Sequence, residues 1–155
     1  MLPLEKFDLE QLAMALENHF EDYETFFWVD PANGSIELWA EGVADEAEAE
    51  GWDVESRDGV RIDTIDSYEA FRDMEKFIAT VAESSHRAQL THAIERSKPF
   101  RHFKNAVHQL PDLLPQWYTF HDKVMTVRSI EWLRDNGLVD FSEADAALAQ
   151  LDAEN

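Results

Sequence analysis

The segment from Pro99 to Leu133 constrains the fold of this chain more than any other stretch of its sequence. It reads PFRHFKNAVHQLPDLLPQWYTFHDKVMTVRSIEWL, and Pro111 divides it into two runs of apolar residues at helical spacing. We predict one helix that begins at Pro99 and a longer one over about residues 113–134. Their predicted inward residues are Phe100, Phe103, Val107, Leu110, Trp117, Phe120, Val124, Val127, Ile130 and Leu133.

Helical spacing also predicts four further helices. One covers residues 9–19 with Asp8 as its N-cap, and one follows the capping box of Asp66 and Glu69. The latter carries an apolar stripe of Tyr68, Phe71, Met74, Phe77, Ile78 and Val81. A third helix starts at Ser84 or Ser85, and a short one starts at Ser142 and runs to about Leu151.

Between the first two helices lies a strand signal. Residues 24–30 and 35–40 are rich in β-formers and are joined by the turn Pro31-Ala32-Asn33-Gly34. Val60 and Ile62 follow the turn Asp58-Gly59 as a third strand, which suggests an antiparallel meander. The acidic residues 42–56 between them suggest a short solvated helix or a loose loop.

These elements predict an α+β fold. It consists of an N-terminal helix, a small three-stranded antiparallel sheet, and a mainly helical C-terminal half packed on the sheet. The length of 155 residues favours a single domain over 1–155, with a core over 9–138 and a helical tail over 139–155.

The charge of the chain is strongly negative and unevenly spread. The net charge is -20, from 33 acidic and 13 basic residues. Residues 1–56 contain 16 acidic residues and a single basic one, so their net charge is -15. The sign reverses between His86 and Arg128, where Arg96, Lys98, Arg101 and Lys104 form a basic patch. Such a pattern usually indicates an acidic, solvated surface. The alternative, functional interpretation is an acidic face that binds a basic partner.

Composition excludes several classes of protein. The chain has no cysteine, which removes disulfides, thiolate metal sites and thiol catalysis and is compatible with a reducing cytoplasm. The first residues, MLPLEKFDLEQL, do not resemble a secretory signal, and no apolar run approaches the length of a membrane span. We therefore expect a cytoplasmic protein that does not enter a membrane.

Four blocks of sequence together point to a known family. They are FFWVDPANGSIELW at 26–39, RIDTIDSYEAFRDMEKFIATV at 61–81, PFRHFK at 99–104 and WYTFHDKVMTVRSIEWL at 117–133. In this order they resemble the bacterial proteins grouped as uncharacterised protein family 0158. That family has no assigned activity, so the resemblance implies an expected fold and no catalytic residues.

Metal chemistry is one candidate function. Five of the six histidines lie in the predicted helical half, namely His86, His92, His102, His108 and His121. The pairs His86/His92 and His102/His108 are six residues apart, so neither pair shares a helix face. His121-Asp122 is an HD dipeptide, as in helical metal-dependent phosphohydrolases, for which Asp140 and another histidine would complete the ligand set. We predict surface histidines with no metal and no cofactor, and keep the phosphohydrolase as the enzyme alternative.

Carboxylate chemistry and nucleic-acid binding are two further candidates. Five carboxylates lie around the start of the helix near residue 67, namely Asp63, Asp66, Glu69, Asp73 and Glu75. We interpret Asp66 and Glu69 as helix caps, and Asp73 and Glu75 as exposed residues beside Arg72 and Lys76. The basic patch could contact phosphates, but the net charge of -20 opposes the approach of a polyanion.

No stretch of the sequence carries a recognisable catalytic constellation. We therefore expect a non-catalytic acidic binding or regulatory module. The candidate partner-binding residues are Glu46, Glu48 and Glu50 on the acidic side and Arg96, Lys98, Arg101 and Lys104 on the basic side. Because the two sets have opposite charge, we also expect weak, salt-sensitive self-association and a basic protein partner.

Overall fold

The computed structural model describes residues 1–154, which fall into two compact units. Unit 1 combines residues 1–64 with the chain from Met125 onward, and unit 2 comprises Ile65–Val124. The boundary at residue 125 lies within the longest helix, α6, which spans Leu114–Asp135. Each unit has its own buried apolar residues.

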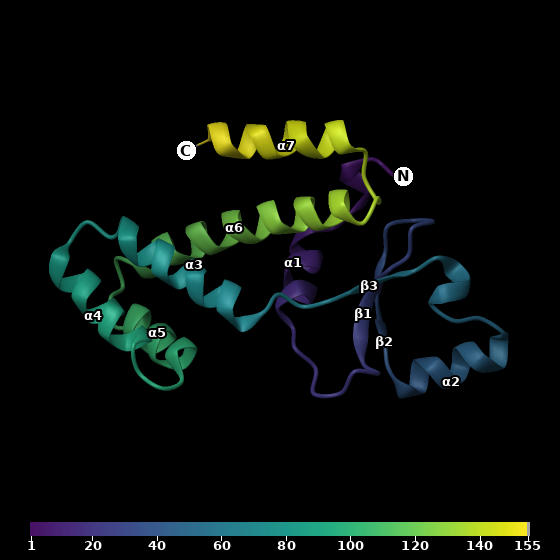
Figure 1. Cartoon of the computed structure of the whole chain (residues 1–155), viewed down its shortest axis with the longest axis horizontal. Helices are drawn as coiled ribbons and strands as arrows, with labels where there is room; N and C mark the ends of the chain where they lie inside the picture. Colours follow the sequence, from purple (N-terminus) through teal and green to yellow (C-terminus); the bar gives the residue numbers. More distant parts are fainter. Residues whose placement is uncertain (155) are drawn as a thin grey trace. The chain divides into compact units, whose positions relative to one another are not determined.

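Unit 1 contains the sheet and the two ends of the chain (Figure 1). Its elements are α1 (Leu9–Glu17), β1 (Phe26–Val29), β2 (Ile36–Trp39), α2 (Glu41–Glu50), β3 (Val60–Ile62), the last turns of α6, and α7 (Phe141–Ala153). Short 3-10 turns cover Leu4–Lys6 and Glu55–Arg57. The N-terminal residues are held on the C-terminal part of the unit, since Leu2 N donates to Leu138 O at 3.1 Å and Leu4 N donates to Glu143 Oε1 at 2.9 Å.

The strand order β2-β1-β3 corrects the predicted meander. The β1–β2 hairpin forms as expected, with Phe26 opposite Trp39 and Val29 opposite Ile36. The buried Asp30 closes its turn, because its carbonyl accepts the N–H of Gly34 at 2.8 Å and its carboxylate accepts the N–H of Ala32 at 3.0 Å. The chain then passes through α2 and returns antiparallel to the other edge of β1, which leaves β1 as the central strand.

The acidic segment after β2 forms the helical alternative of the two that its sequence suggested. Helix α2 buries Ala47 and leaves its carboxylates exposed. It ends at Gly51, whose φ of 82° is the left-handed conformation that favours glycine at a helix C-terminus. Trp52 N then donates to Ala47 O at 2.9 Å, which directs the chain back toward the sheet.

Unit 2 is helical (Figure 1), and its buried residues form one cluster that contains several aromatic rings. Its helices are α3 (Ser67–Thr80), α4 (Ser84–Ile94), α5 (Pro99–His108) and the first part of α6. The buried Phe77 of α3 lies at the centre, with ring centroids 6.3 Å from Phe103, 5.2 Å from Trp117 and 5.5 Å from Phe120. The inward faces predicted for α5 and the start of α6 therefore do form a core.

Several predicted side-chain positions are wrong. Phe100 is 42% exposed, because the buried stripe of α5 is formed by Phe103, Ala106 and Val107. Tyr68 is also exposed, and Asp73, predicted to be exposed, is only 5% exposed. The buried residues of α3 are Asp73, Met74, Phe77 and Ile78. The buried face of the helix is therefore rotated from the predicted one, and it includes Asp73.

Helix caps are predicted correctly at two of four positions. Asp8 Oδ1 accepts the N–H of Gln11, and Asp66 Oδ1 accepts the N–H groups of Tyr68 and Glu69. By contrast, α4 has no side-chain cap, and α7 is capped by Asp140 where Ser142 was predicted. Asp140 accepts from both Ser142 N and Ser142 Oγ.

The fold is α+β, with an N-terminal helix, a small three-stranded antiparallel sheet and a helical C-terminal half. Within the described residues, no helix combines the length and the apolar character that crossing a membrane requires.

Gly59 tests the packing that holds the sheet together. A Cβ at this position would lie 2.5 Å from Trp28 Cε3 and 2.7 Å from Val54 Cγ1, so we expect Gly59→Ala to lower the free energy of unfolding by about 1–3 kcal/mol. Gly42→Ala is the matched control, because nothing lies within 4 Å of its Cβ and alanine favours a helix. Urea unfolding measures both; equal stability of the two variants would contradict the packing.

Candidate partner-binding surface

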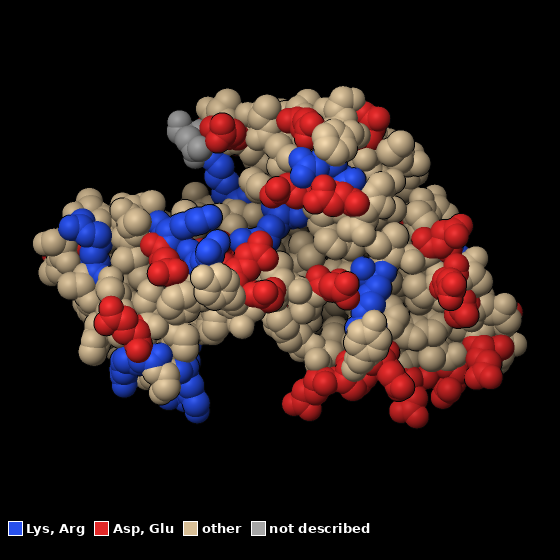
Figure 2. All heavy atoms as spheres, in the orientation of Figure 1, with Lys and Arg blue, Asp and Glu red and all other residues tan. Residues whose placement is uncertain are grey.

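The whole net charge of the protein resides in unit 1. Unit 2 contains eight acidic and eight basic residues, which leaves 25 acidic and five basic residues in unit 1. Unit 1 therefore has a net charge of -20 and unit 2 a net charge of zero. Figure 2 shows carboxylates gathered along α2 and the neighbouring loop before β1. Unit 1 consequently has a strongly negative surface that attracts cations over several ångströms.

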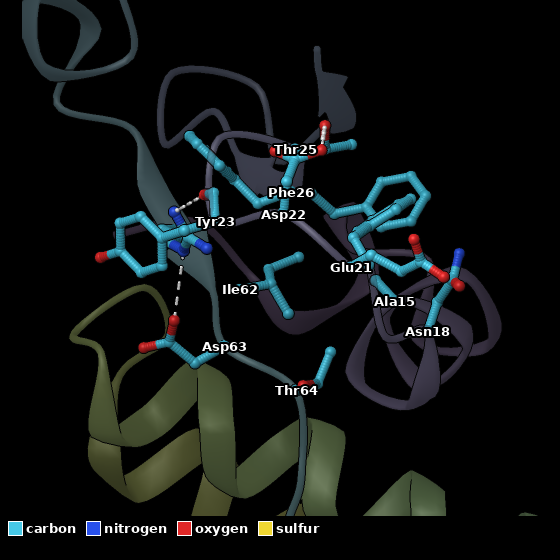
Figure 3. Close-up of a pocket in the computed structure, with 13 residues that line it drawn as sticks. Ala15, Asn18, Glu21, Asp22, Tyr23, Thr25, Phe26, Ile62, Asp63 and Thr64 are labelled. Atoms are coloured by element: carbon cyan, nitrogen blue, oxygen red, sulfur yellow. Dashed lines mark hydrogen bonds and ion pairs between the residues drawn. The ribbon is translucent and has the colours of Figure 1, made fainter.

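Arg61 on β3 organises one end of this surface. Its guanidinium lies over two rings, 3.8 Å from the centroid of Tyr23 and 4.2 Å from that of Phe26. Nη1 donates to Tyr23 O at 2.8 Å, while Nε lies 3.3 Å from Asp63 Oδ1, an ion-pair distance without hydrogen-bond alignment. Figure 3 marks the polar contacts with Tyr23 and Asp63. Ile62 and Thr64 help to line the adjacent hollow, which has a volume of about 350 Å³. Arg61 is thus held by its partners on several sides.

A row of aromatic rings continues from Arg61 along the sheet. Phe26 stacks on Trp39 with ring centroids 6.5 Å apart, and Trp39 meets Trp52 edge-on at 5.6 Å. Trp52 in turn packs on the buried Trp28 at 6.1 Å. The guanidinium of Arg57 lies 3.5 Å above the Trp52 ring, so an arginine lies over a ring on each side of Trp39.

Two open hollows flank the half-buried Trp39. The larger, which we call the Trp39 hollow, has a volume of about 640 Å³, within the usual range of ligand sites. Its lining includes Glu24, Phe26, Trp39, Glu41, Asp45 and Arg61. The second, of about 360 Å³, shares Trp39 and Ala44 with the first and adds Glu48, Trp52 and Asp53.

One face of α2 supplies three of the carboxylates that line the two hollows. Glu41, Ala44, Asp45 and Glu48 are spaced by three or four residues, so they share a face of the helix. Among the described residues, the side chains of Glu24, Glu41 and Asp45 have no hydrogen bond or ion pair with another protein group. These three carboxylates remain available to an external cation.

The three acidic residues predicted from the sequence occupy different positions. Glu48 lines the second hollow, whereas Glu46 lines neither. Glu50 accepts a hydrogen bond from Trp52 Nε1 at 3.1 Å, so it supports the aromatic row. Glu41 and Asp45 were not predicted from the sequence, although a helix over residues 41–50 would place both on one face with Glu48.

The predicted basic residues lie together around the turn between α4 and α5 in unit 2. Arg96, Lys98, Arg101 and Lys104 are all exposed, and Figure 2 shows basic side chains gathered there. Lys98 immediately precedes α5 and has a φ of 55°, and the exposed Phe100 adds an apolar ring to the patch. This basic patch is separate from the aromatic core beneath it.

His102 reports on the electrostatics of the basic patch. Desolvation lowers its pKa from the ordinary value near 6.5, and the positive charges of Arg96, Arg101 and Lys98 lower it further. The folded state therefore binds a proton at His102 less readily than the unfolded chain does. The stability contributed by neutral His102 is present above about pH 6.5 and is lost as pH falls below that value.

The remaining histidines have separate surroundings among the described residues. Within residues 1–154, no group of three or more His, Asp or Glu side chains is arranged to hold a metal ion. His121 packs against Trp117 with ring centroids 5.4 Å apart, and His86 Nδ1 lies 3.2 Å from Glu83 Oε2. Asp140 is engaged as the cap of α7, and its hydrogen bond from Ser142 lowers its pKa.

The carboxylates predicted as a cluster near residue 67 have separate structural roles. Asp63 pairs with Arg61, Asp66 caps α3, and Asp73 is buried in unit 2. Asp63 belongs to unit 1, whereas the other members belong to unit 2.

Comparison with known proteins places this chain in a family. The model of the uncharacterised protein family UPF0158 matches residues 5–154. The chain belongs to this family. A family relative from Pseudomonas aeruginosa, the UPF0158 protein PA5073, is 26% identical over 131 residues, which cover 84% of this chain and 83% of the relative. No solved structure matches the chain.

Membership of UPF0158 confirms the resemblance inferred from the four sequence blocks. Those blocks lie at the hairpin and β2, at β3 and α3, at the start of α5, and along α6. The blocks contain several packed aromatic residues of each unit, among them Trp28 and Trp39 in unit 1 and Phe77, Phe103 and Trp117 in unit 2. The family description assigns no activity, so the function has to be argued from the surface of unit 1.

The pKa of His102 tests the basic patch directly. We expect the pKa of His102 to lie below 6.5 at low salt and to rise in Arg96→Gln, because Arg96 exerts the largest of the charge effects on it. Proton NMR of the imidazole resonances during a pH titration measures this, with Arg72→Gln on α3 as a control. An ordinary His102 pKa that is unaffected by Arg96→Gln would contradict the electrostatic assignment.

Proposed function

We propose that this chain is a non-catalytic binding module whose acidic unit 1 takes a basic protein partner. The observation that carries this proposal is the partition of charge, since unit 1 holds the entire net charge of -20. Like charges at this density repel one another, and the binding of a polycation reduces this repulsion. The hollows on either side of Trp39 give such a partner apolar contact area as well as charge.

The proposal places the module in the cytoplasm, with which the absence of cysteine is compatible. A basic protein segment fits the surface better than a nucleic acid does. The basic patch at Arg96–Lys104 is small, and a polyanion would have to approach a chain whose net charge is -20. Single-stranded and duplex DNA therefore serve as negative probes in the test of this proposal.

Binding of a lysine-rich peptide tests the proposed function. We expect the peptide to bind at low salt and to weaken as salt rises, because screening shortens the range of the attraction. Replacing Glu46, Glu48 and Glu50 by Gln should weaken binding by about three-fold or more, since each exposed charge contributes a few tenths of a kcal/mol. Fluorescence anisotropy with a labelled peptide measures both effects.

The matched control removes the same amount of charge from unit 2. Glu75→Gln, Glu95→Gln and Asp112→Asn alter exposed carboxylates of that unit and should leave binding nearly unchanged. Equal losses in both triple variants would show that only the overall charge matters. Failure of the peptide to bind at low salt would contradict the proposed function altogether.

Weak self-association is a second proposal, and the geometry of the basic patch supports it. The exposed ring of Phe100 lies among Lys98, Arg101 and Lys104. The basic patch of one copy therefore has both apolar and cationic groups that can contact the acidic surface of another copy. The contact must be weak, because two whole chains with a net charge of -20 repel each other.

Sedimentation at high protein concentration tests self-association. We expect the weight-average mass to rise above that of the monomer at low salt and to return to it at high salt. Arg101→Glu with Lys104→Glu should abolish the rise, whereas Arg72→Glu on α3 should not. A monomer at low salt and high concentration would remove this proposal.

A further inference from the structure

We infer that the Trp39 hollow binds the guanidinium group of an arginine in the basic partner and selects it over lysine. This inference rests on the proposed function, because it names the side chain that the acidic unit recognises. It goes beyond general attraction between charges, since it assigns the ring of Trp39 and the carboxylates of Glu41 and Asp45 as the contacts.

The protein itself shows how this surface receives an arginine. Both arginines of residues 1–64 lie over aromatic rings, one on each side of Trp39 in the row that contains it. Arg57 lies 3.5 Å above Trp52, and Arg61 lies about 4 Å from the rings of Tyr23 and Phe26. A guanidinium is planar and weakly hydrated, so it stacks on such rings while its N–H groups remain free to donate.

Trp39 occupies the middle of the row and lacks such a partner. Its ring meets Phe26 and Trp52, and among the described residues no cation lies over it. It forms part of the wall of both hollows, and it is only half-buried. Tryptophan is the aromatic side chain that attracts a cation most strongly, so this open ring is the strongest unused cation site of the row.

The carboxylates around the ring suit an arginine in number and position. Glu41 and Asp45 lie one turn apart on α2, and Glu24, in the loop before β1, also lines the hollow. A guanidinium over Trp39 could donate N–H groups to two carboxylates at once, which a lysine ammonium cannot do in the same plane. The geometry therefore combines stacking with forked hydrogen bonding.

Arg61 does not fill the hollow that it helps to line. Its guanidinium is held between Tyr23 and Phe26 and is fixed by the Tyr23 carbonyl and by Asp63. Its charge is partly offset by Asp63, while the three carboxylates named above remain without a protein partner. The hollow consequently keeps a net negative charge toward an incoming cation.

Two labelled peptides of the same length and charge test the inference on the whole protein. One carries arginines and the other lysines, each separated by glycine and serine. We expect the arginine peptide to bind about ten-fold more tightly, because it gains both a cation–π contact and a bidentate hydrogen bond. Asp45→Asn should remove most of this preference, while Glu46→Gln on the other face of α2 changes charge equally and should preserve it.

The outcomes separate the inference from the proposed function. Equal binding of the two peptides would overturn the arginine site and leave the basic-partner proposal standing, whereas no binding of either would overturn both. Trp39→Leu should also remove the preference, with its fold checked by circular dichroism. If that variant unfolds, Asp45→Asn decides, and an undiminished preference in Asp45→Asn overturns the inference.

Discussion

The packing of Trp28 in the central strand is the interaction on which unit 1 depends. Its side chain is 1% exposed, and it touches Gly59 so closely that no side chain fits there. Trp52 packs on Trp28, Trp39 packs on Trp52, and Phe26 stacks on Trp39. The same contacts that attach the segment after α2 to the sheet therefore fix the ring that the arginine site requires.

Charge imposes the second constraint on this unit. Twenty-five carboxylates against five cations create repulsion that only packing and counterions can balance. Both arginines of residues 1–64 make stacking contacts, since Arg57 and Arg61 each lie over aromatic rings. Arg61 also pairs with Asp63. The charges of unit 2 are balanced, and its buried residues centre on the Phe77 cluster.

The helices and strands were largely predictable from the sequence, but the pairing of β3 with β1 was not. The stripe from Phe71 to Val81 and the turn at Pro31–Gly34 carry local signals, so α3 and the β1–β2 hairpin were predicted. The position of β3 beside β1 depends on how the chain packs after α2, which no local pattern encodes. Asp73 and Phe100 were misplaced for a related reason, since small rotations of a helix decide which boundary residue is buried.

The candidate site shows the same limit. The acidic segment was recognised from its charge, but Glu46, Glu48 and Glu50 were chosen by proximity in sequence. The structure groups Glu41, Asp45 and Glu48 instead, because they share the face of α2 toward Trp39. The role of Trp39 itself could not be predicted, since it follows from the contact with Trp52 across twelve residues of intervening chain.

The most direct test of this account is a map of amide and indole NMR shifts while the unlabelled arginine peptide is added to the labelled protein. The account predicts that the largest changes occur at the Trp39 indole and at Glu41 and Asp45 of α2, with little change around Arg101 in unit 2. Shifts spread evenly over the carboxylates of unit 1, or confined to unit 2, would contradict it.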